Sequence, residues 1–209
     1  KKTPAKQPAS PAARGGSSAV DAFLAKAKAI APLATSGRGR MIFALDATMS
    51  RQPTWDTAQQ LQAEMFDEAG KTGALDVQLV YFRGFNECRA SRWVSETRSL
   101  RNLMTGIECR AGNTQIGKVL AHARNEAARG KVNVLVFVGD AQEEAVDDLA
   151  AKAGELGLLG VRAFFFQEGT DPDVERVFRD IARLTGGAYA RFDPQAAGQL
   201  SQLLRAAAA

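Results

Sequence analysis

Short apolar runs alternate with stretches of helical spacing along almost the whole chain. Runs that are nearly all apolar predict buried strands at 40–46, 75–84, 132–140, 161–167 and 186–192. A shorter run with polar neighbours, SRWVSE at 91–96, predicts an edge strand that forms a hairpin with the second of these strands.

Between these runs, apolar residues recur every three or four positions, which is the period of an amphipathic helix. This spacing predicts helices at 19–31, 54–70, 97–105, 115–129, 143–157, 172–185 and 194–208. Regular alternation of strand and helix is typical of a three-layer αβα, Rossmann-like fold with a mostly parallel sheet and, here, one antiparallel edge strand.

The N-terminal segment 1–16, KKTPAKQPASPAARGG, contains no large apolar residue. Nothing in it offsets the entropy lost on ordering, so we expect a disordered basic tail or linker there and one α/β domain at 17–209. Four of the chain's 27 basic residues and none of its 23 acidic residues lie in this segment. The remainder therefore carries equal numbers of both signs and gives no electrostatic argument for nucleic-acid binding.

Polar side chains follow the buried strands at the points where those strands end. MIFALDATMS ends the first strand in Asp46, and Thr48 and Ser50 follow at alternate positions. Asp140 ends the central strand VNVLVFVGD, and Thr114 closes the loop AGNT before a helix. In open α/β sheets, ligands bind beyond the carboxyl ends of the strands, so these five residues are the candidates for chemistry.

Taken singly, each candidate has an ordinary structural explanation. Asp, Thr and Ser after a strand commonly form turns and helix caps, and Thr114 suits the N-cap of the helix at 115–129. The functional interpretation therefore depends on the combination of all five residues.

This combination resembles the von Willebrand factor A family, over about residues 17–205. In that family a metal-ion-dependent adhesion site reads DxSxS after the first strand, with a Thr before a helix and an Asp after the central strand. The resemblance implies a von Willebrand factor A fold and a bound Mg²⁺ or Mn²⁺ whose ligands are Asp46, Thr48, Ser50, Thr114 and Asp140. It also implies a protein-interaction module rather than an enzyme, in which an Asp or Glu of a partner protein completes the metal's coordination.

The chain departs from the family pattern at two positions. Thr48 replaces the first Ser of the motif, and Ala141 replaces the Gly that more often follows the last Asp. Neither change removes an oxygen ligand, although Ala141 restricts the loop backbone slightly.

Several neighbouring residues allow more than one interpretation. Glu143 and Glu144 could support or compete for the ion, but residues of a first helical turn are the favoured explanation. Arg51 could steer an acidic partner, although we expect a solvated side chain, and Trp55 could line the site or pack in the core. The single histidine, His122, is expected at the surface.

The cysteines and the lengths of the apolar runs indicate where in the cell the protein is expected. The two cysteines, Cys88 and Cys109, fit free thiols better than a disulfide, and zinc is improbable with one histidine. No apolar run reaches the length of a membrane span. We therefore expect a bacterial cytoplasmic protein.

Enzyme classes fit the motif less well. A haloacid-dehalogenase-like enzyme needs a second Asp two residues after the first, where this chain has Thr48. A receiver domain with Asp140 as phosphate acceptor needs an acidic pair at the end of the first strand, and only Asp46 stands there. A metal-dependent hydrolase or phosphotransferase that uses Asp46 and Asp140 remains the alternative function.

Overall fold

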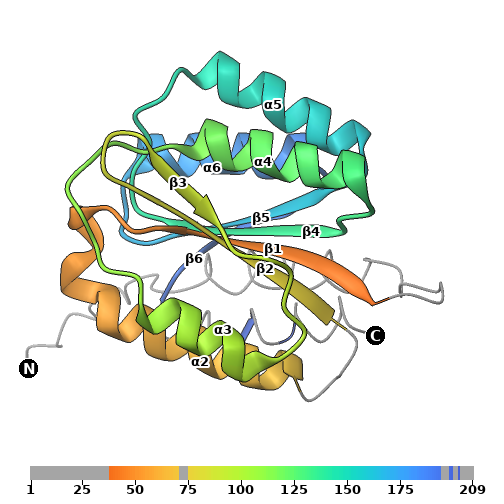
Figure 1. Ribbon diagram of the computed structural model, residues 1–209. Helices are drawn as coiled ribbons and strands as arrows, with labels where there is room; N and C mark the ends of the chain where they lie inside the picture. Colours follow the sequence, from red (N-terminus) through yellow and green to blue (C-terminus); the bar gives the residue numbers. More distant parts are fainter. Residues whose placement is uncertain (1–37, 71–74, 194–197, 200–201, 203–209) are drawn as a thin grey trace, which may run out of the picture.

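A single sheet lies between two layers of helices (Figure 1). The computed structural model describes residues 38–70, 75–193, 198–199 and 202. The sheet has six strands in the order β3-β2-β1-β4-β5-β6, and all neighbours are parallel except β2 and β3. The strands are β1 (Gly39–Asp46), β2 (Leu75–Arg83), β3 (Glu87–Ala90), β4 (Val134–Gly139), β5 (Arg162–Gln167) and β6 (Ala188–Arg191).

In the described part of the chain, helices cover both faces of the sheet (Figure 1). α2 (Trp55–Gly70) and α3 (Thr97–Thr105) form the first layer, and a short 3-10 helix, η1 (Met49–Thr54), leads into α2. The second layer consists of α4 (Ile116–Arg129), α5 (Val146–Leu158) and α6 (Pro172–Leu184). Within the described ranges, no helix combines the length and apolar character needed to cross a membrane.

Alternate residues of β1 serve the two halves of the core. Met41, Phe43 and Leu45 pack with the apolar residues of α2 and α3, whereas Ile42 and Ala44 pack with those of α4, α5 and α6. Because both faces of this strand are covered, its sequence is continuously apolar rather than alternating.

The structure confirms the predicted fold class and most of the predicted elements. The five buried strands and the five predicted helices between 54 and 185 are present, with ends that shift by up to a few residues. The predicted tail at 1–16, the helix at 19–31 and most of the helix at 194–208 lie outside the described residues.

The predicted edge strand at 91–96 was wrong. The strand that pairs antiparallel with β2 is β3, and Val94 makes only an isolated bridge with Val77. Gly84 adopts a φ of 62°, which turns the chain within three residues, so pairing resumes at once with Arg83 opposite Glu87. The antiparallel edge strand itself is therefore confirmed, but it lies four residues nearer the turn.

Phe137 of β4 is the centre of the aromatic packing in the second layer. Its ring lies 4.8 Å from Phe165, 5.5 Å from Phe178 and 6.1 Å from Phe82, measured between ring centroids, and it is fully buried. We expect Phe137→Ala to lower the free energy of unfolding by about 3–5 kcal/mol, because it removes this contact area and leaves a cavity. Urea denaturation of wild type and variant measures the change.

Phe85 provides the matched control, since it is 79% exposed. We expect Phe85→Ala to change the free energy of unfolding by less than about 0.5 kcal/mol. A similar loss in both variants would contradict the central role of Phe137.

Candidate metal centre

The parallel register of β1 and β4 brings two acidic residues to the same edge of the sheet. Leu45 pairs with Val138, so Asp46 at the end of β1 and Asp140 just after β4 both lie immediately beyond this pair. Gly139 lies against Asp46, because a Cβ atom built on it would be 3.2 Å from the Cβ atom of Asp46. The absence of a side chain at 139 thus leaves room for the carboxylate of Asp46.

Each of these carboxylates has a buried oxygen that no described protein group satisfies. Asp46 is fully buried, and its Oδ1 atom accepts a hydrogen bond of 2.8 Å from the amide of Thr48. Its Oδ2 atom has no hydrogen-bond partner among the described residues, and neither does Oδ1 of Asp140. Unpaired buried oxygens are rare in proteins and costly, and two of them at one edge fit a site for a cation.

Burial raises the pKa of Asp46 from 3.8 to about 6. Hydrogen bonds from Thr48 and the positive charge of Arg51 act in the opposite direction, whereas the negative charge of Asp140 adds to the increase. Keeping Asp46 ionised at neutral pH therefore costs free energy, which a bound cation would offset.

Two hydroxyl groups lie directly after Asp46. The Oγ1 atom of Thr48 and the Oγ atom of Ser50 are 3.0 Å apart and share a hydrogen bond. Thr48 is 5% exposed, whereas Ser50 is exposed, so this pair runs from the buried carboxylate toward solvent.

The loop that carries Thr114 is held beside this turn by main-chain contacts. The amide of Arg110 donates to the carbonyl of Ala47 at 3.0 Å, and Arg110 forms a parallel bridge with Thr48. Farther along, Gly112 lies directly on the backbone of Gly84, with no room for a Cβ atom. The loop is therefore fixed against both β1 and the hairpin.

Thr114 itself is joined to the loop that follows Asp140. Its amide donates to Oε2 of Glu143 at 2.9 Å, and its Oγ1 atom accepts from the amide of Glu143 at 3.0 Å. Thr114 does not cap α4, whose N-cap residue is Gln115. Its side chain is thus tied to the segment that carries Asp140.

Solved structures share this arrangement of strands and helices. The chain aligns with a von Willebrand factor type A protein from Catenulispora acidiphila with a TM-score of 0.63 and 17% identity, over 80% of this chain and 42% of that one. The chain has the von Willebrand factor A fold. The SpRpn10 von Willebrand factor A domain gives a TM-score of 0.61 and 13% identity, over 79% of this chain and 93% of that domain.

A third similar structure is proximal thread matrix protein 1 from the mussel byssus, solved with a zinc-occupied MIDAS motif. It aligns with a TM-score of 0.67 and 18% identity, over 80% of this chain and 46% of that one. The chain thus spans less than half of the Catenulispora and mussel chains. By sequence, it matches no known family and no curated protein.

In this von Willebrand factor A fold, the candidate ligands are mostly uncharged. Among the described residues, no three His, Cys, Asp or Glu side chains gather where they could hold a metal. The edge formed by Asp46 and Asp140 instead offers two carboxylates together with the hydroxyls of Thr48, Ser50 and Thr114. Hydrogen bonds and strand register bring these residues to one edge, and their ligation of a metal stays a prediction.

The favoured explanation of Glu143 and Glu144 as first-turn residues of their helix was wrong. α5 begins only at Val146, and both carboxylates reach back toward α4. Glu144 accepts hydrogen bonds from the amides of Ile116 and Gly117, the first two residues of α4. It therefore satisfies the free amides of a neighbouring helix, while Glu143 holds Thr114.

The expectation of a solvated Arg51 was also wrong. Its side chain is fully buried, with Nη1 donating to the carbonyl of Asp46 at 2.7 Å and Nε donating to Oε2 of Glu168 at 2.7 Å. The guanidinium lies 5.3 Å from the ring centre of Trp55, and its Nη2 atom has no hydrogen-bond partner among the described residues. Arg51 thus places a positive charge directly beside the turn that follows Asp46.

Glu168 was not among the residues predicted from the sequence. It follows the buried strand β5 directly, as Asp140 follows β4, and its amide donates to the carbonyl of Gly139 at 2.9 Å. The signal that singled out Asp46 and Asp140, an acid at the end of an apolar strand, could have found it.

The remaining candidates have structural roles. Trp55 is buried and donates to the carbonyl of Ile107 at 3.0 Å, so it packs in the core. His122 is half-buried rather than on the surface, lies 2.8 Å from Oε1 of Gln78, and has a pKa lowered by burial. Cys88 and Cys109 are free, as predicted.

Asp46→Asn should stabilise the metal-free protein at neutral pH. The folded state binds the extra proton between pH 3.8 and about 6, so the stability of wild type falls as pH rises through this window. In the presence of chelator at about pH 7.5, we expect the variant to be more stable by about 2 kcal/mol, and the difference should vanish near pH 4. Urea denaturation across this pH range measures the effect, and equal stability at neutral pH would contradict it.

Arg51→Met should destabilise the protein, because Glu168 loses its buried cation and the carbonyl of Asp46 loses its donor. We expect a loss of about 3–5 kcal/mol in the free energy of unfolding. Adding Glu168→Gln should recover part of it, with a coupling energy of about 1–3 kcal/mol in a double-mutant cycle. Strict additivity of the two changes would show that the pair is not energetically linked.

Proposed function

We propose that this chain is a metal-dependent protein-interaction module. Its cation is Mg²⁺ or Mn²⁺, and an Asp or Glu side chain of a partner protein binds to it. The ligands are Asp46, Thr48, Ser50, Thr114 and Asp140.

The observation that carries this proposal is the pair of unsatisfied buried oxygens, Oδ2 of Asp46 and Oδ1 of Asp140. Mg²⁺ and Mn²⁺ prefer oxygen ligands, and the carboxylates and hydroxyls of this site offer only oxygen atoms. The fit is independent of the resemblance, because it follows from which atoms lack partners.

The composition of the site favours a partner's carboxylate as the missing ligand. Mg²⁺ prefers about six oxygen ligands, and the five side chains leave one position to water or a partner. Three of the five are neutral hydroxyls, which leave the bound ion electrophilic toward an incoming carboxylate. Ser50 is exposed and Asp140 is partly exposed, so a partner approaching the site reaches them from solvent.

The similar structures support a divalent metal and an interaction role. The mussel byssus protein was solved with zinc in its MIDAS motif, and another similar structure is a pilus adhesin, SpaC, from Lactobacillus rhamnosus, with a TM-score of 0.61 and 9% identity over 83% of this chain. The choice of Mg²⁺ or Mn²⁺ over zinc rests on the all-oxygen ligand set.

A cytoplasmic location is also our proposal. It is supported by the two free cysteines, which are typical of a reducing compartment.

Metal binding is tested by calorimetry and thermal unfolding with Mg²⁺. We expect heat of binding for wild type and an unfolding temperature that rises with metal concentration. At a metal concentration about 100 times the dissociation constant, the free energy of unfolding should increase by about 2.7 kcal/mol. Asp140→Asn should lose both effects. Asp180→Asn is the matched control, because Asp180 is a half-exposed acid of α6 that pairs with Arg183.

Partner binding is tested by affinity capture with wild type and Asp46→Ala, in Mg²⁺ and in chelator. A protein retained only by the wild type with metal supports the proposal. Mg²⁺-dependent hydrolysis of p-nitrophenyl phosphate that Asp46→Ala abolishes would instead establish the hydrolase alternative.

A further inference from the structure

We propose that the partner is an acidic segment that also carries an apolar side chain, and that it docks over the β2–β3 hairpin beside the metal site. This inference rests on the proposed function and adds the surface that selects the partner. We define the hairpin surface as Phe85, Arg89, Arg110 and Lys118.

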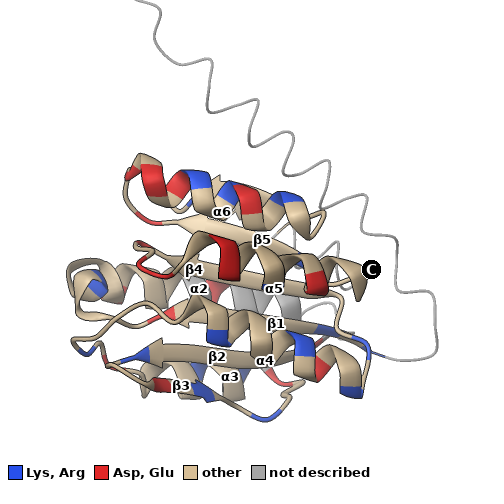
Figure 2. Cartoon of the chain, turned by 90° about the horizontal axis from the view of Figure 1, so that it is seen from above, with Lys and Arg blue, Asp and Glu red and all other residues tan. Residues whose placement is uncertain are grey.

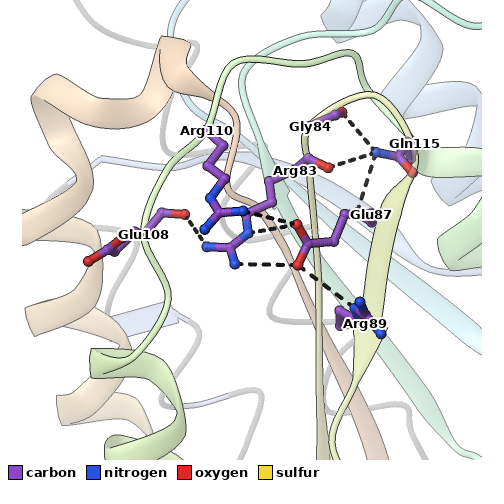
Figure 3. A network of polar contacts seen from close by, with 7 residues as sticks. All are labelled: Arg83, Gly84, Glu87, Arg89, Glu108, Arg110 and Gln115. Atoms are coloured by element: carbon purple, nitrogen blue, oxygen red, sulfur yellow. Dashed lines mark hydrogen bonds and ion pairs between the residues drawn. The ribbon is translucent and has the colours of Figure 1, made fainter.

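One carboxylate lies among three guanidinium groups at this hairpin (Figure 3). Arg83 holds Glu87 with two hydrogen bonds, of 3.1 and 3.3 Å, and its side chain is only 12% exposed. Arg89 and Arg110 lie 3.8 and 3.9 Å from the same carboxylate and are 71% and 60% exposed. Because Arg83 already neutralises Glu87, the two exposed arginines present positive charge to solvent.

Two further side chains of opposite charge, Glu108 and Lys118, lie near the hairpin and offset each other's charge. Glu108, whose carbonyl accepts from Arg83, is an exposed acid, and Lys118 is an exposed base bonded to the side chains of Asn86 and Gln115. The hairpin surface therefore keeps an excess of positive charge, which complements an acidic segment.

The hairpin surface directly adjoins the residues of the proposed metal site. Arg110 forms a bridge with Thr48, and its amide donates to Ala47. The amide of Asn113, next to Thr114, donates to the carbonyl of Gly84 at 3.2 Å, and Gln115 donates to the same carbonyl at 3.2 Å. A peptide whose carboxylate is bound at the metal site would therefore reach these arginines with its neighbouring residues.

The opposite side of the metal edge is acidic. Figure 2 shows basic residues at the end of β2 and β3, and acidic residues at the beginnings of α5 and α6. The acids on that side include Glu143, Asp147, Asp148, Asp171 and Asp173, all exposed. Like charges would repel an acidic segment there, so the segment is oriented toward the hairpin.

Phe85 supplies the apolar part of the hairpin surface. It stands at the tip of the hairpin, immediately after Gly84, and is 79% exposed. A large exposed ring at the tip of the hairpin whose strands carry Arg83 and Arg89 gives a partner an aromatic anchor, the type of residue that dominates binding energy at interfaces.

The test uses two fluorescent peptides on the same Gly-Ser background, measured by anisotropy in Mg²⁺. One carries a single Asp, and the other carries an Asp flanked on each side by Glu and Leu. We expect wild type to bind the second peptide about tenfold more tightly, because surface ion pairs and a buried ring each contribute modestly. Chelator and Asp140→Asn should abolish the binding of both peptides.

Variants assign this preference to the hairpin surface. Arg89→Gln/Arg110→Gln and Phe85→Ser should each remove about threefold to tenfold of the preference and leave the single-Asp peptide unchanged. The matched controls are Arg129→Gln/Arg183→Gln, with exposures of 77% and 70%, and Leu158→Ser, 91% exposed. These control residues lie in the last turns of α4, α6 and α5, away from the hairpin and the proposed metal site, so the preference should persist.

The outcomes separate this inference from the proposed function. Equal affinity of wild type for both peptides, with both lost in chelator, overturns the hairpin surface and leaves the metal site standing. Binding of the acidic peptide that survives chelator but fails in the arginine variant supports the hairpin surface and contradicts the metal site. Tighter binding of single-stranded DNA than of the acidic peptide, also lost in the arginine variant, overturns the protein partner.

Discussion

The parallel pairing of β1 with β4 is the constraint on which the rest of the site depends. Because of this pairing, two strands that are covered on both faces end side by side. Asp46 and Asp140 therefore cannot move apart without breaking the hydrogen bonds between β1 and β4. The fold thereby holds two carboxylates at one edge, each with a buried oxygen that has no hydrogen-bond partner among the described residues. The desolvation of Asp46 and its repulsion by Asp140 oppose folding, whereas the apolar core on both faces of β1 supports it. A region kept at such a cost is typical of a binding site.

The surrounding polar groups limit that cost without removing it. Arg51 neutralises Glu168 and polarises the carbonyl of Asp46, yet neither of its described hydrogen bonds reaches the carboxylate of Asp46. Glu143 and Glu144 are engaged with Thr114 and the first amides of α4, so their bonded oxygens are already occupied by amides. Arg51 and Glu168 thus pair with each other, and Glu143 and Glu144 are engaged by amides. The oxygens of Asp46 and Asp140 that lack a partner among the described residues remain available to a cation.

The sequence predicted what depends on local pattern and missed what depends on contacts between distant residues. Apolar runs located the strands, and their polar ends located Asp46 and Asp140, because strand period and the edge of a parallel sheet are visible in one segment at a time. The partner of β2 was misplaced, since the turn at Gly84 fixes the register and the pattern at 91–96 does not. Burial of Arg51 depends on Glu168, which is 117 residues away, and no local signal reports such a pair.

Under the proposed function, the distribution of charge around this edge would explain how residues 17–209, which carry equal numbers of acidic and basic side chains, can still select a charged partner. A net charge near zero produces little attraction at long range, and salt screens charges beyond about 8 Å. Selection must then come from groups in contact with the bound segment. Phe85, Arg89 and Arg110 lie at or beside the β2–β3 hairpin. Acidic residues lie on the other side of the edge, at the beginnings of α5 and α6 (Figure 2). A carboxylate alone would satisfy the metal in either orientation, so this asymmetry is what would give the partner's chain a direction.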